Sequence, residues 1–183
     1  MKIQLNHFSD LPVLETDRLF LKPLNKEFLS QKYVNWLNDE SVNRYLDSGG
    51  DYNFKKLTNY LEGVELNPSL FWAIIQKEKN KHIGNIKIDP IDKKNLCGEY
   101  GIMIGDKNEW GKGIAKETSL SVVNFCFNRL GLKKINLGVI ALHTYAIKLY
   151  ESIGFKQEAC LKSDRFFEGS LVDVLRMSIL NTK

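Results

Sequence analysis

The sequence lacks any long apolar run, and its amino-terminal segment lacks a basic patch followed by an apolar stretch. We therefore expect neither a membrane span nor a signal peptide, which predicts a cytoplasmic protein with no membrane partner. Cysteine is scarce. The three cysteines, an odd number, are widely spaced at Cys97, Cys126 and Cys160. This spacing argues against a disulfide framework and a zinc knuckle. We expect all three to be buried as small hydrophobic side chains.

An excess of charge of one sign is also missing. The chain has 26 Lys and Arg against 22 Asp and Glu, a formal net charge of +4. No segment gathers Lys and Arg with interleaved aromatic residues, so no nucleic-acid partner is expected. A mild positive balance is compatible with an anionic ligand such as a nucleotide. Repeats, low-complexity tracts and long linkers are absent too, and the 183 residues predict a single domain over 1–183.

Hydrophobic periodicity predicts an α+β domain. Alternating or continuous apolar runs predict strands over 17–24, 70–76, 82–89, 97–105, 134–140, 155–161 and 171–180. Helical spacing predicts helices over 26–39, with Asn25 as the cap, and over 53–65, 115–129 and 144–153. The resulting architecture is a mixed, largely antiparallel seven-stranded sheet flanked by about four helices, with a strand-helix-strand unit in its second half.

The most informative stretch is the loop WGKGIA, from Trp110 to Ala115, between a predicted strand and a predicted helix. Gly111 and Gly113 allow a tight turn and a close approach of the backbone to a ligand. The following helix offers unpaired N–H groups and the positive end of its dipole, which favours a phosphate or pyrophosphate. The glycine pattern alone is equally typical of a tight turn. It lacks the Gly-Lys-Ser/Thr ending of a P-loop and the third glycine of a dinucleotide fingerprint.

Three separated motifs carry a resemblance to a known family. LETDRLFLKPL, EYGIMIGDKNEWGKGIAKE and AIKLYESIGF follow one another in the order seen in the GCN5-related N-acetyltransferase (GNAT) superfamily. The first two resemble its ribosomal-protein alanine acetyltransferase branch, and the similarity runs from about Glu15 to Leu180. The resemblance implies a GNAT-like fold, acetyl-coenzyme A as cosubstrate, no metal, and transfer of an acetyl group to a primary amine.

The resemblance also implies roles for residues at matching positions. Loop N–H groups would hold the coenzyme A pyrophosphate, and the pantetheine arm would pair with a strand that also offers an N–H to the thioester carbonyl. Lys112 either contacts the phosphates or faces solvent. The residues implied for coenzyme binding are Ile102, Met103, Ile104, Trp110, Gly111, Lys112, Gly113, Ile114, Ala115 and His143.

Tyr150 and Glu99 are the candidate catalytic residues. Tyr150 matches the family tyrosine near the coenzyme sulfur, where a phenol can protonate the departing thiolate, although its helical spacing also suits a core residue. Glu99 is the candidate general base, because strand alternation places it on the face opposite Tyr100; a solvated strand face is the other interpretation. His143 stands where the family commonly has Asn, and it either donates one hydrogen bond, joins the proton path as the alternative base, or is structural.

The acceptor remains open at the level of sequence. We expect a small amine such as an amino sugar, possibly nucleotide-linked, and direct attack in a ternary complex. The N-terminus of a ribosomal protein is an alternative acceptor, whereas a polyamine would require more acidic residues. A non-catalytic coenzyme A-binding regulatory module is an alternative of another class, and a homodimer is possible for such sheets. The aromatic residues expected either in the core or on the cleft wall are Trp36, Tyr45, Trp72 and Phe166.

Overall fold

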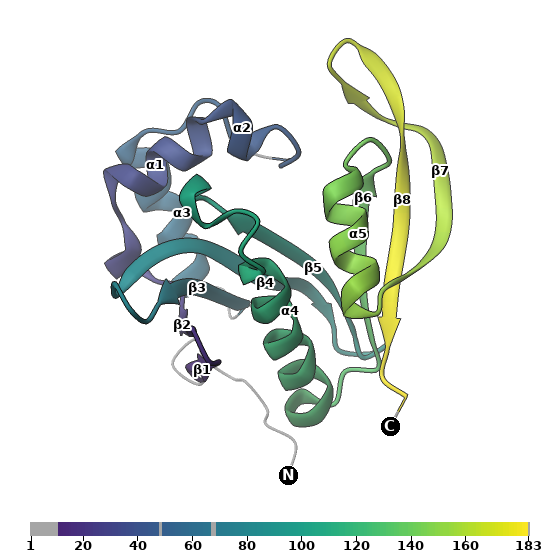
Figure 1. Cartoon of the computed structure of the whole chain (residues 1–183), viewed down its shortest axis with the longest axis horizontal. Coiled ribbons are helices and arrows are strands. Elements are labelled where there is room, and N and C mark those ends of the chain that lie inside the picture. The colour runs from purple at the N-terminus through teal and green to yellow at the C-terminus, as the bar shows by residue number, and fades with distance from the viewer. Residues whose placement is uncertain (1–10, 48, 67–68, 183) are drawn as a thin grey trace.

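A computed structural model of the chain describes residues 11–47, 49–66 and 69–182. Within these residues the chain forms one sheet of eight strands and five α-helices (Figure 1). The strands are β1 (Leu14–Glu15), β2 (Leu19–Pro23), β3 (Leu70–Gln76), β4 (Lys81–Asp92), β5 (Cys97–Ile104), β6 (Lys134–Ile140), β7 (Lys156–Phe167) and β8 (Ser170–Leu180). The helices are α1 (Gln31–Asn38), α2 (Glu40–Asn43), α3 (Phe54–Leu66), α4 (Ile114–Phe125) and α5 (Thr144–Ile153).

The strand order across the sheet is β1-β2-β3-β4-β5-β6-β8-β7. Neighbouring strands are antiparallel except β5 and β6, which are parallel because α4 connects them. The predicted mixed, largely antiparallel sheet is therefore confirmed, with eight strands instead of seven and five helices instead of four. The additional strand is β1, whose two residues cover the outer edge of β2.

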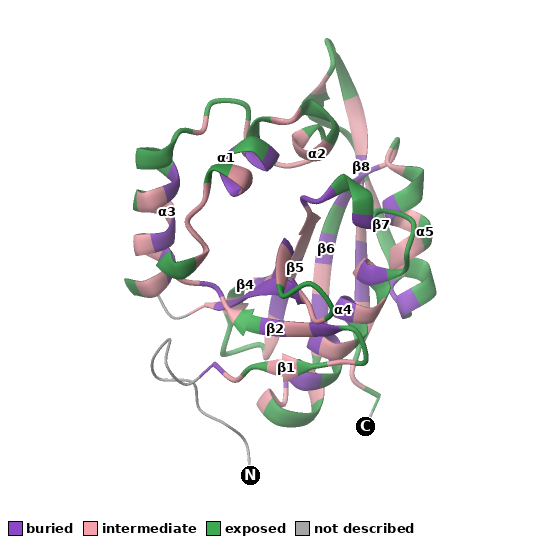
Figure 2. Ribbon diagram, turned by 60° about the vertical axis from the view of Figure 1, so that its left-hand side comes forward, coloured by how far each residue is buried: buried purple, intermediate pink, exposed green. Residues whose placement is uncertain are grey.

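Strand β3 separates two hydrophobic cores. Leu70, Trp72 and Ile74 point to one face of the sheet and pack with residues of α4 and α5. The alternate residues Phe71 and Ala73 pack on the opposite face with α1 and α3. Both faces of β3 are thus covered by helices, which explains why its sequence is a continuous apolar run. Figure 2 shows the buried residues of α1 and α3 on their inner sides.

The sheet is interrupted between β5 and β6. Their ladder extends only from the pair Cys97 and Lys134 to the pair Glu99 and Asn136. Beyond this point the two strands diverge, while β4 and β8 remain paired with their outer edges as far as Ile104 and Ile140 (Figure 1). The result is a V-shaped gap in the centre of the sheet, bordered by backbone groups that have no neighbouring strand.

The backbone of β5 faces this gap at alternate residues. The N–H of Gly105 donates to the carbonyl of Ile83 in the extension of β4, at 2.9 Å. Alternate residues of a strand direct their N–H and C=O groups to the same side. The backbone N–H and C=O of Met103 therefore point toward β4, and those of Ile102 and Ile104 point toward the gap. The strand that was predicted to pair with a ligand therefore directs the backbone groups of Ile102 and Ile104 into the gap, where the carbonyl of Ile104 accepts from Trp110.

Two helix boundaries differ from prediction. The helix expected over 26–39 is divided into a 3₁₀ turn, η2 (Lys26–Phe28), capped by Asn25, and α1, whose N-cap is Ser30. The helix expected over 115–129 is α4 followed by a π-helical turn, η4 (Cys126–Leu130). In the described part of the chain, no helix is long and apolar enough to cross a membrane.

Candidate active site

The start of α4 lies at the mouth of the gap and presents an open set of backbone N–H groups. Gly111 and Gly113 have φ values of 74° and 76°, in the left-handed region that favours glycine. Gly113 is the N-cap residue of α4 and has no side chain to cap the free N–H groups of the first turn. A Cβ atom added to Gly111 would meet nothing within 4 Å. The geometry of the loop fits a diphosphate.

Two buried carboxylates, Asp106 and Glu109, lie in the segment between β5 and this loop and form ion pairs with lysines. Asp106 is 5% exposed and forms ion pairs with Lys81 at 2.5 Å and Lys32 at 3.3 Å. Glu109 is 3% exposed and accepts from Lys112 Nζ at 3.2 Å. The ammonium of Lys112 is therefore paired with Glu109, while its side chain remains 53% exposed. This agrees with the solvent-facing position considered for Lys112, and a contact with the phosphates stays a prediction.

The other predicted loop residues connect the loop to its surroundings. The indole N–H of Trp110 donates to the carbonyl of Ile104 at 2.8 Å, on the side of β5 that faces the gap. Ile114 is buried in the core, and the carbonyl of Ala115 accepts from the hydroxyl of Ser119 at 2.6 Å. The sequence WGKGIA thus joins the end of β5 to the start of α4.

Replacing Asp106 by Asn is expected to destabilise the protein in a pH-dependent way. Burial raises the pKa of Asp106, but hydrogen bonds from Lys81 and Lys32 outweigh it and lower the pKa to about 2. A lowered pKa in the folded state gives stability that is present above the unfolded value and is lost as the pH falls toward 2. The difference in melting temperature between wild type and Asp106→Asn should therefore be largest near pH 7 and shrink between pH 4 and pH 2.

Asp51→Asn is the matched control for this measurement, because Asp51 pairs with Lys56 on the surface, where both side chains are well exposed. Exposed pairs contribute little, so we expect almost no change in melting temperature for this variant. An Asp106→Asn difference that stayed constant from pH 7 to pH 2 would contradict the assignment to the ionised carboxylate.

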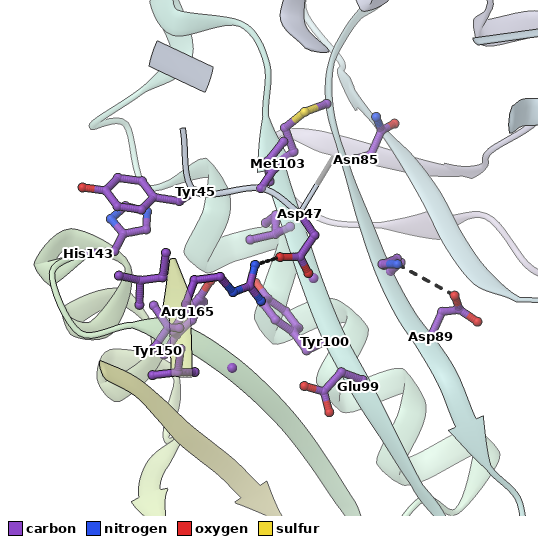
Figure 3. Close-up of a pocket in the computed structure, with 18 of the residues that line it drawn as sticks. Tyr45, Asp47, Asn85, Asp89, Glu99, Tyr100, Met103, His143, Tyr150 and Arg165 are labelled. Carbon is purple, nitrogen blue, oxygen red and sulfur yellow. Dashed lines mark hydrogen bonds and ion pairs between the residues drawn. The ribbon is translucent and has the colours of Figure 1, made fainter. Parts of the chain in front are cut away.

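A cavity of about 540 Å³ is lined by residues of both β5 and β6, and Figure 3 shows side chains of its lining. Its lining includes side chains from both faces of the sheet, such as Tyr100 and Tyr150 from the α4 and α5 face and Lys87 and Met103 from the other. Ile104 and the loop from Trp110 to Ala115 are not part of this lining. The predicted site residues that line it are Glu99, Ile102, Met103, His143 and Tyr150.

Tyr150 is placed in this cavity with a free hydroxyl. Its ring packs edge-on against Tyr100, with the ring centroids 5.6 Å apart, and against Phe155 at 6.0 Å. The hydroxyl forms no hydrogen bond with any described residue, whereas that of Tyr100 bonds the hydroxyl of Ser119 at 2.6 Å. Burial raises the pKa of Tyr150 to about 12, which keeps the phenol protonated near neutral pH. The side chain is therefore both packed and available as a proton donor.

Glu99 lies near the closed end of the gap, in a bidentate ion pair. Its two carboxylate oxygens accept from the Nη1 and Nη2 atoms of Arg176 in β8, at 2.8 and 2.9 Å. Each oxygen retains a further lone pair for a water molecule or an amine. Arg176 was missed by the sequence analysis, although an arginine within the apolar strand LVDVLRMSIL is a signal that could have revealed it.

His143 forms part of an aromatic stack at the wall of the cavity (Figure 3). Its ring is stacked on Tyr45 with the centroids 3.9 Å apart, and Tyr45 is stacked in turn on Phe167 at 5.2 Å. Burial lowers the pKa of His143, which favours the neutral imidazole. The segment that carries Tyr45 is fastened to the β7–β8 hairpin by ion pairs of Arg44 with Glu168 and of Asp47 with Arg165.

The charges that line the cavity are largely paired with one another. Besides the pairs of Glu99 and Asp47, Asp89 lies 3.8 Å from Lys87. Asp164 is the one carboxylate of the lining that forms no ion pair among the described residues, although its charge acts on Arg176 from a greater distance. It follows Ser163, whose φ of 51° marks the register shift between Leu161 and Arg165 in β7. Such a bulge redirects the neighbouring side chain.

The large aromatic residues divide between core and site. Trp72 is fully buried, Trp36 is 6% exposed and Phe166 is 72% exposed, whereas Tyr45 lines the cavity. Tyr33 and Tyr60 also line it and were not predicted. Their side chains come from α1 and α3, the helical region expected to form the acceptor wall.

The cysteines correct one prediction. Only Cys126 is buried, while Cys97 and Cys160 are half-buried. Cys97 begins β5, and Cys160 lies in β7, the strand at the edge of the sheet. In the described part of the chain, no group of three or more His, Cys, Asp or Glu residues is arranged to hold a metal.

Comparison with known proteins shows the family of the chain. The family model described as acetyltransferase (GNAT) domain matches residues 18–156. An uncharacterized N-acetyltransferase, p20, of Bacillus licheniformis is 29% identical over 175 residues, covering 93% of this chain and 97% of that protein. A crystal structure of spermidine N-acetyltransferase from Vibrio cholerae with CoA and spermine has a TM-score of 0.83 and 27% identity, covering 92% of this chain and 98% of that one.

A ribosomal-protein-S5-alanine acetyltransferase from Vibrio fischeri has a TM-score of 0.78 at 17% identity, covering 94% of this chain and 98% of that one. At this identity the likeness concerns the fold alone. The chain belongs to the GNAT acetyltransferase family. It is an N-acetyltransferase that uses acetyl-coenzyme A.

Proposed function

We propose that the enzyme transfers the acetyl group of acetyl-coenzyme A directly to the primary amine of a small acceptor that is not a polycation, such as an amino sugar, either free or nucleotide-linked. The donor would enter the gap with its diphosphate at the first turn of α4 and its pantetheine arm along Ile102 and Ile104. The acceptor would enter from the side lined by α1 and α3. The two substrates would then meet in the cavity lined by residues of both β5 and β6.

The choice of an amino sugar over a polyamine rests on the charged residues that line the cavity. Three of its four carboxylates, those of Asp47, Asp89 and Glu99, have a cationic partner. A polycation needs unpaired carboxylates along its length, because the cost of desolvating several ammonium groups must be met by opposite charges. Paired charges, together with the tyrosine hydroxyls and the amide of Asn85 in the lining, are better suited to an acceptor with hydroxyl groups.

The proposed mechanism assigns one proton transfer to each of two residues. The acceptor nitrogen attacks the thioester carbonyl carbon, and a proton leaves the nitrogen through water to Glu99. An N–H of β5 that faces the gap, from Ile102 or Ile104, stabilises the oxyanion. The C–S bond then breaks, and the departing thiolate takes the hydroxyl proton of Tyr150. Glu99 releases its proton to water, and Tyr150 takes a proton from water, which restores both residues for the next cycle.

The test is a thiol-release assay with acetyl-coenzyme A against a panel of amino sugars, nucleotide-linked amino sugars, polyamines, amino acids and N-terminal peptides. We expect kcat/KM for the best amino sugar to exceed that for spermidine by at least about tenfold, since the paired carboxylates do not favour a trivalent cation. A preference for spermidine would contradict the proposed acceptor. A preference for an N-terminal peptide would also contradict it and favour a protein substrate.

A polyamine is the second candidate, favoured by the likeness to the spermidine N-acetyltransferase of Vibrio cholerae and by the unpaired carboxylate of Asp164. Asp164→Asn separates the two candidates. If the acceptor is a polyamine, this variant should raise its KM severalfold by removing the free negative charge. For a neutral amino sugar, the KM should change little.

A further inference from the structure

Arg18 lies beside the diphosphate loop, although it comes from the turn between β1 and β2. Its Nη1 atom donates to the carbonyl of Lys112 at 2.9 Å. A Cβ atom added to Gly113 would lie 3.7 Å from its Nη2 atom. The guanidinium is half exposed and is thus at the surface of the loop, beside the first turn of α4.

The same guanidinium neutralises a carboxylate in the first turn of α4. Its Nε and Nη2 atoms lie 2.7 and 2.6 Å from Oε2 of Glu117. The other oxygen of Glu117 accepts from the hydroxyl of Thr16 at 2.6 Å and from the backbone N–H of Arg18 at 3.0 Å. Burial raises the pKa of Glu117, and these hydrogen bonds lower it overall, so the carboxylate is ionised.

An ionised carboxylate at this position creates a conflict for an anionic ligand. A negative charge in the first turn of a helix is favourable for the helix itself, because it complements the dipole. For a diphosphate bound at the same turn, however, it is a like charge within a few ångströms. The position of Arg18 removes the conflict by placing a permanent positive charge between Glu117 and the loop.

The hydrogen bond from Arg18 to the carbonyl of Lys112 also fixes the orientation of the Lys112–Gly113 peptide. In a planar trans peptide the C=O and the following N–H point in opposite directions. When the carbonyl of Lys112 is held by Arg18, the N–H of Gly113 is therefore turned away from Arg18. This orients the N–H for a ligand and also prevents the carbonyl oxygen from turning toward the phosphates.

We propose that Arg18 is a positioning residue for the acyl donor, which orients the Lys112–Gly113 peptide and cancels the charge of Glu117 at the diphosphate site. The inference rests on the proposed placement of the donor at this loop. Its consequence is that a residue some hundred positions before the loop determines how tightly the enzyme holds coenzyme A. Arg18 acts through the loop and does not touch the reacting atoms.

Calorimetric titration of coenzyme A into wild type, Arg18→Ala, Glu117→Gln and the double variant tests this inference. Arg18→Ala should weaken binding by about 10- to 100-fold, the effect of losing one or two charge-assisted hydrogen bonds. The double variant should recover part of this loss, because the uncovered charge is gone. The loss should be the same for 3′-dephospho-coenzyme A, since Arg18 acts at the diphosphate, and should decrease at high salt.

Lys26→Ala is the matched control, because Lys26 forms surface ion pairs with Glu62 and Glu65, which lie in α3. It should bind coenzyme A as wild type does, and thermal unfolding of each variant shows whether it is folded. Equal affinity of wild type and Arg18→Ala would overturn the inference while leaving the proposed function intact, and so would a double variant no better than Arg18→Ala. A wild type that takes up no coenzyme A would overturn both.

Discussion

Replacing Tyr150 by Phe is expected to lower kcat by about 100- to 10,000-fold, the usual contribution of a general acid. The affinity for coenzyme A should remain close to that of the wild type, because the ring keeps its contacts with Tyr100 and Phe155. Only the hydroxyl is lost, and it has no partner among the described residues whose hydrogen bond would be broken. Steady-state kinetics with the best acceptor of the panel and calorimetry with coenzyme A measure the two quantities.

Tyr100→Phe is the matched control for this change. Tyr100 lines the same cavity and touches Tyr150, but its hydroxyl is engaged with Ser119 at 2.6 Å. Losing this buried hydrogen bond should cost about 0.5–1.5 kcal/mol of stability and leave kcat within severalfold of wild type. If the two variants lost activity equally, Tyr150 would be a packing residue and the thiolate would take its proton elsewhere.

The pH dependence gives an independent check on the same group. Because the pKa of Tyr150 is raised to about 12, the phenol remains protonated throughout the range in which the enzyme is assayed. A general acid with this pKa produces no loss of kcat between pH 7 and pH 10. Any decline of kcat in that range would have to arise from another group.

Local patterns were sufficient to predict several elements of the fold. The run LFWAIIQ and the segment KINLGVI form strands with the predicted bounds, 70–76 and 134–140, and the helix over 144–153 ends at Gly154 as expected. Each of these segments has one strong local signal, either a continuous apolar run or a terminal glycine, and the tertiary structure favours the same element. The short elements β1 and α2 have too few residues to show a period, and both were missed.

The contacts that form the site depend on pairs far apart in the sequence. Alternation placed Glu99 correctly on the face opposite Tyr100, yet nothing local indicates that it would meet Arg176, 77 residues later. The pairs of Arg44 with Glu168 and of Arg18 with Glu117 are even more distant, 124 and 99 residues apart. Periodicity can assign a side chain to a face, but the identity of its partner depends on strand order, which a single sequence does not contain.

Gly113→Val is expected to weaken the binding of coenzyme A by about 10- to 100-fold or more. Valine at a φ of 76° is strained by roughly 1–2 kcal/mol, and relief of this strain would rotate the peptide whose N–H faces the proposed diphosphate site. Its side chain would also lie at the point where the proposed diphosphate would approach the backbone. Calorimetric titration of coenzyme A measures the loss, and thermal unfolding measures the strain.

Gly169→Val separates these two contributions. Gly169 has a φ of 84°, and a Cβ atom there would meet nothing within 4 Å, so the strain is similar to that at Gly113. Because Gly169 lies in the turn between β7 and β8, away from α4, the variant should lose comparable stability and bind coenzyme A as wild type does (Figure 1). If Gly113→Val lost stability but kept its affinity, the first turn of α4 would have to be abandoned as the diphosphate site, because a rotated peptide there could not leave a ligand held by that N–H undisturbed.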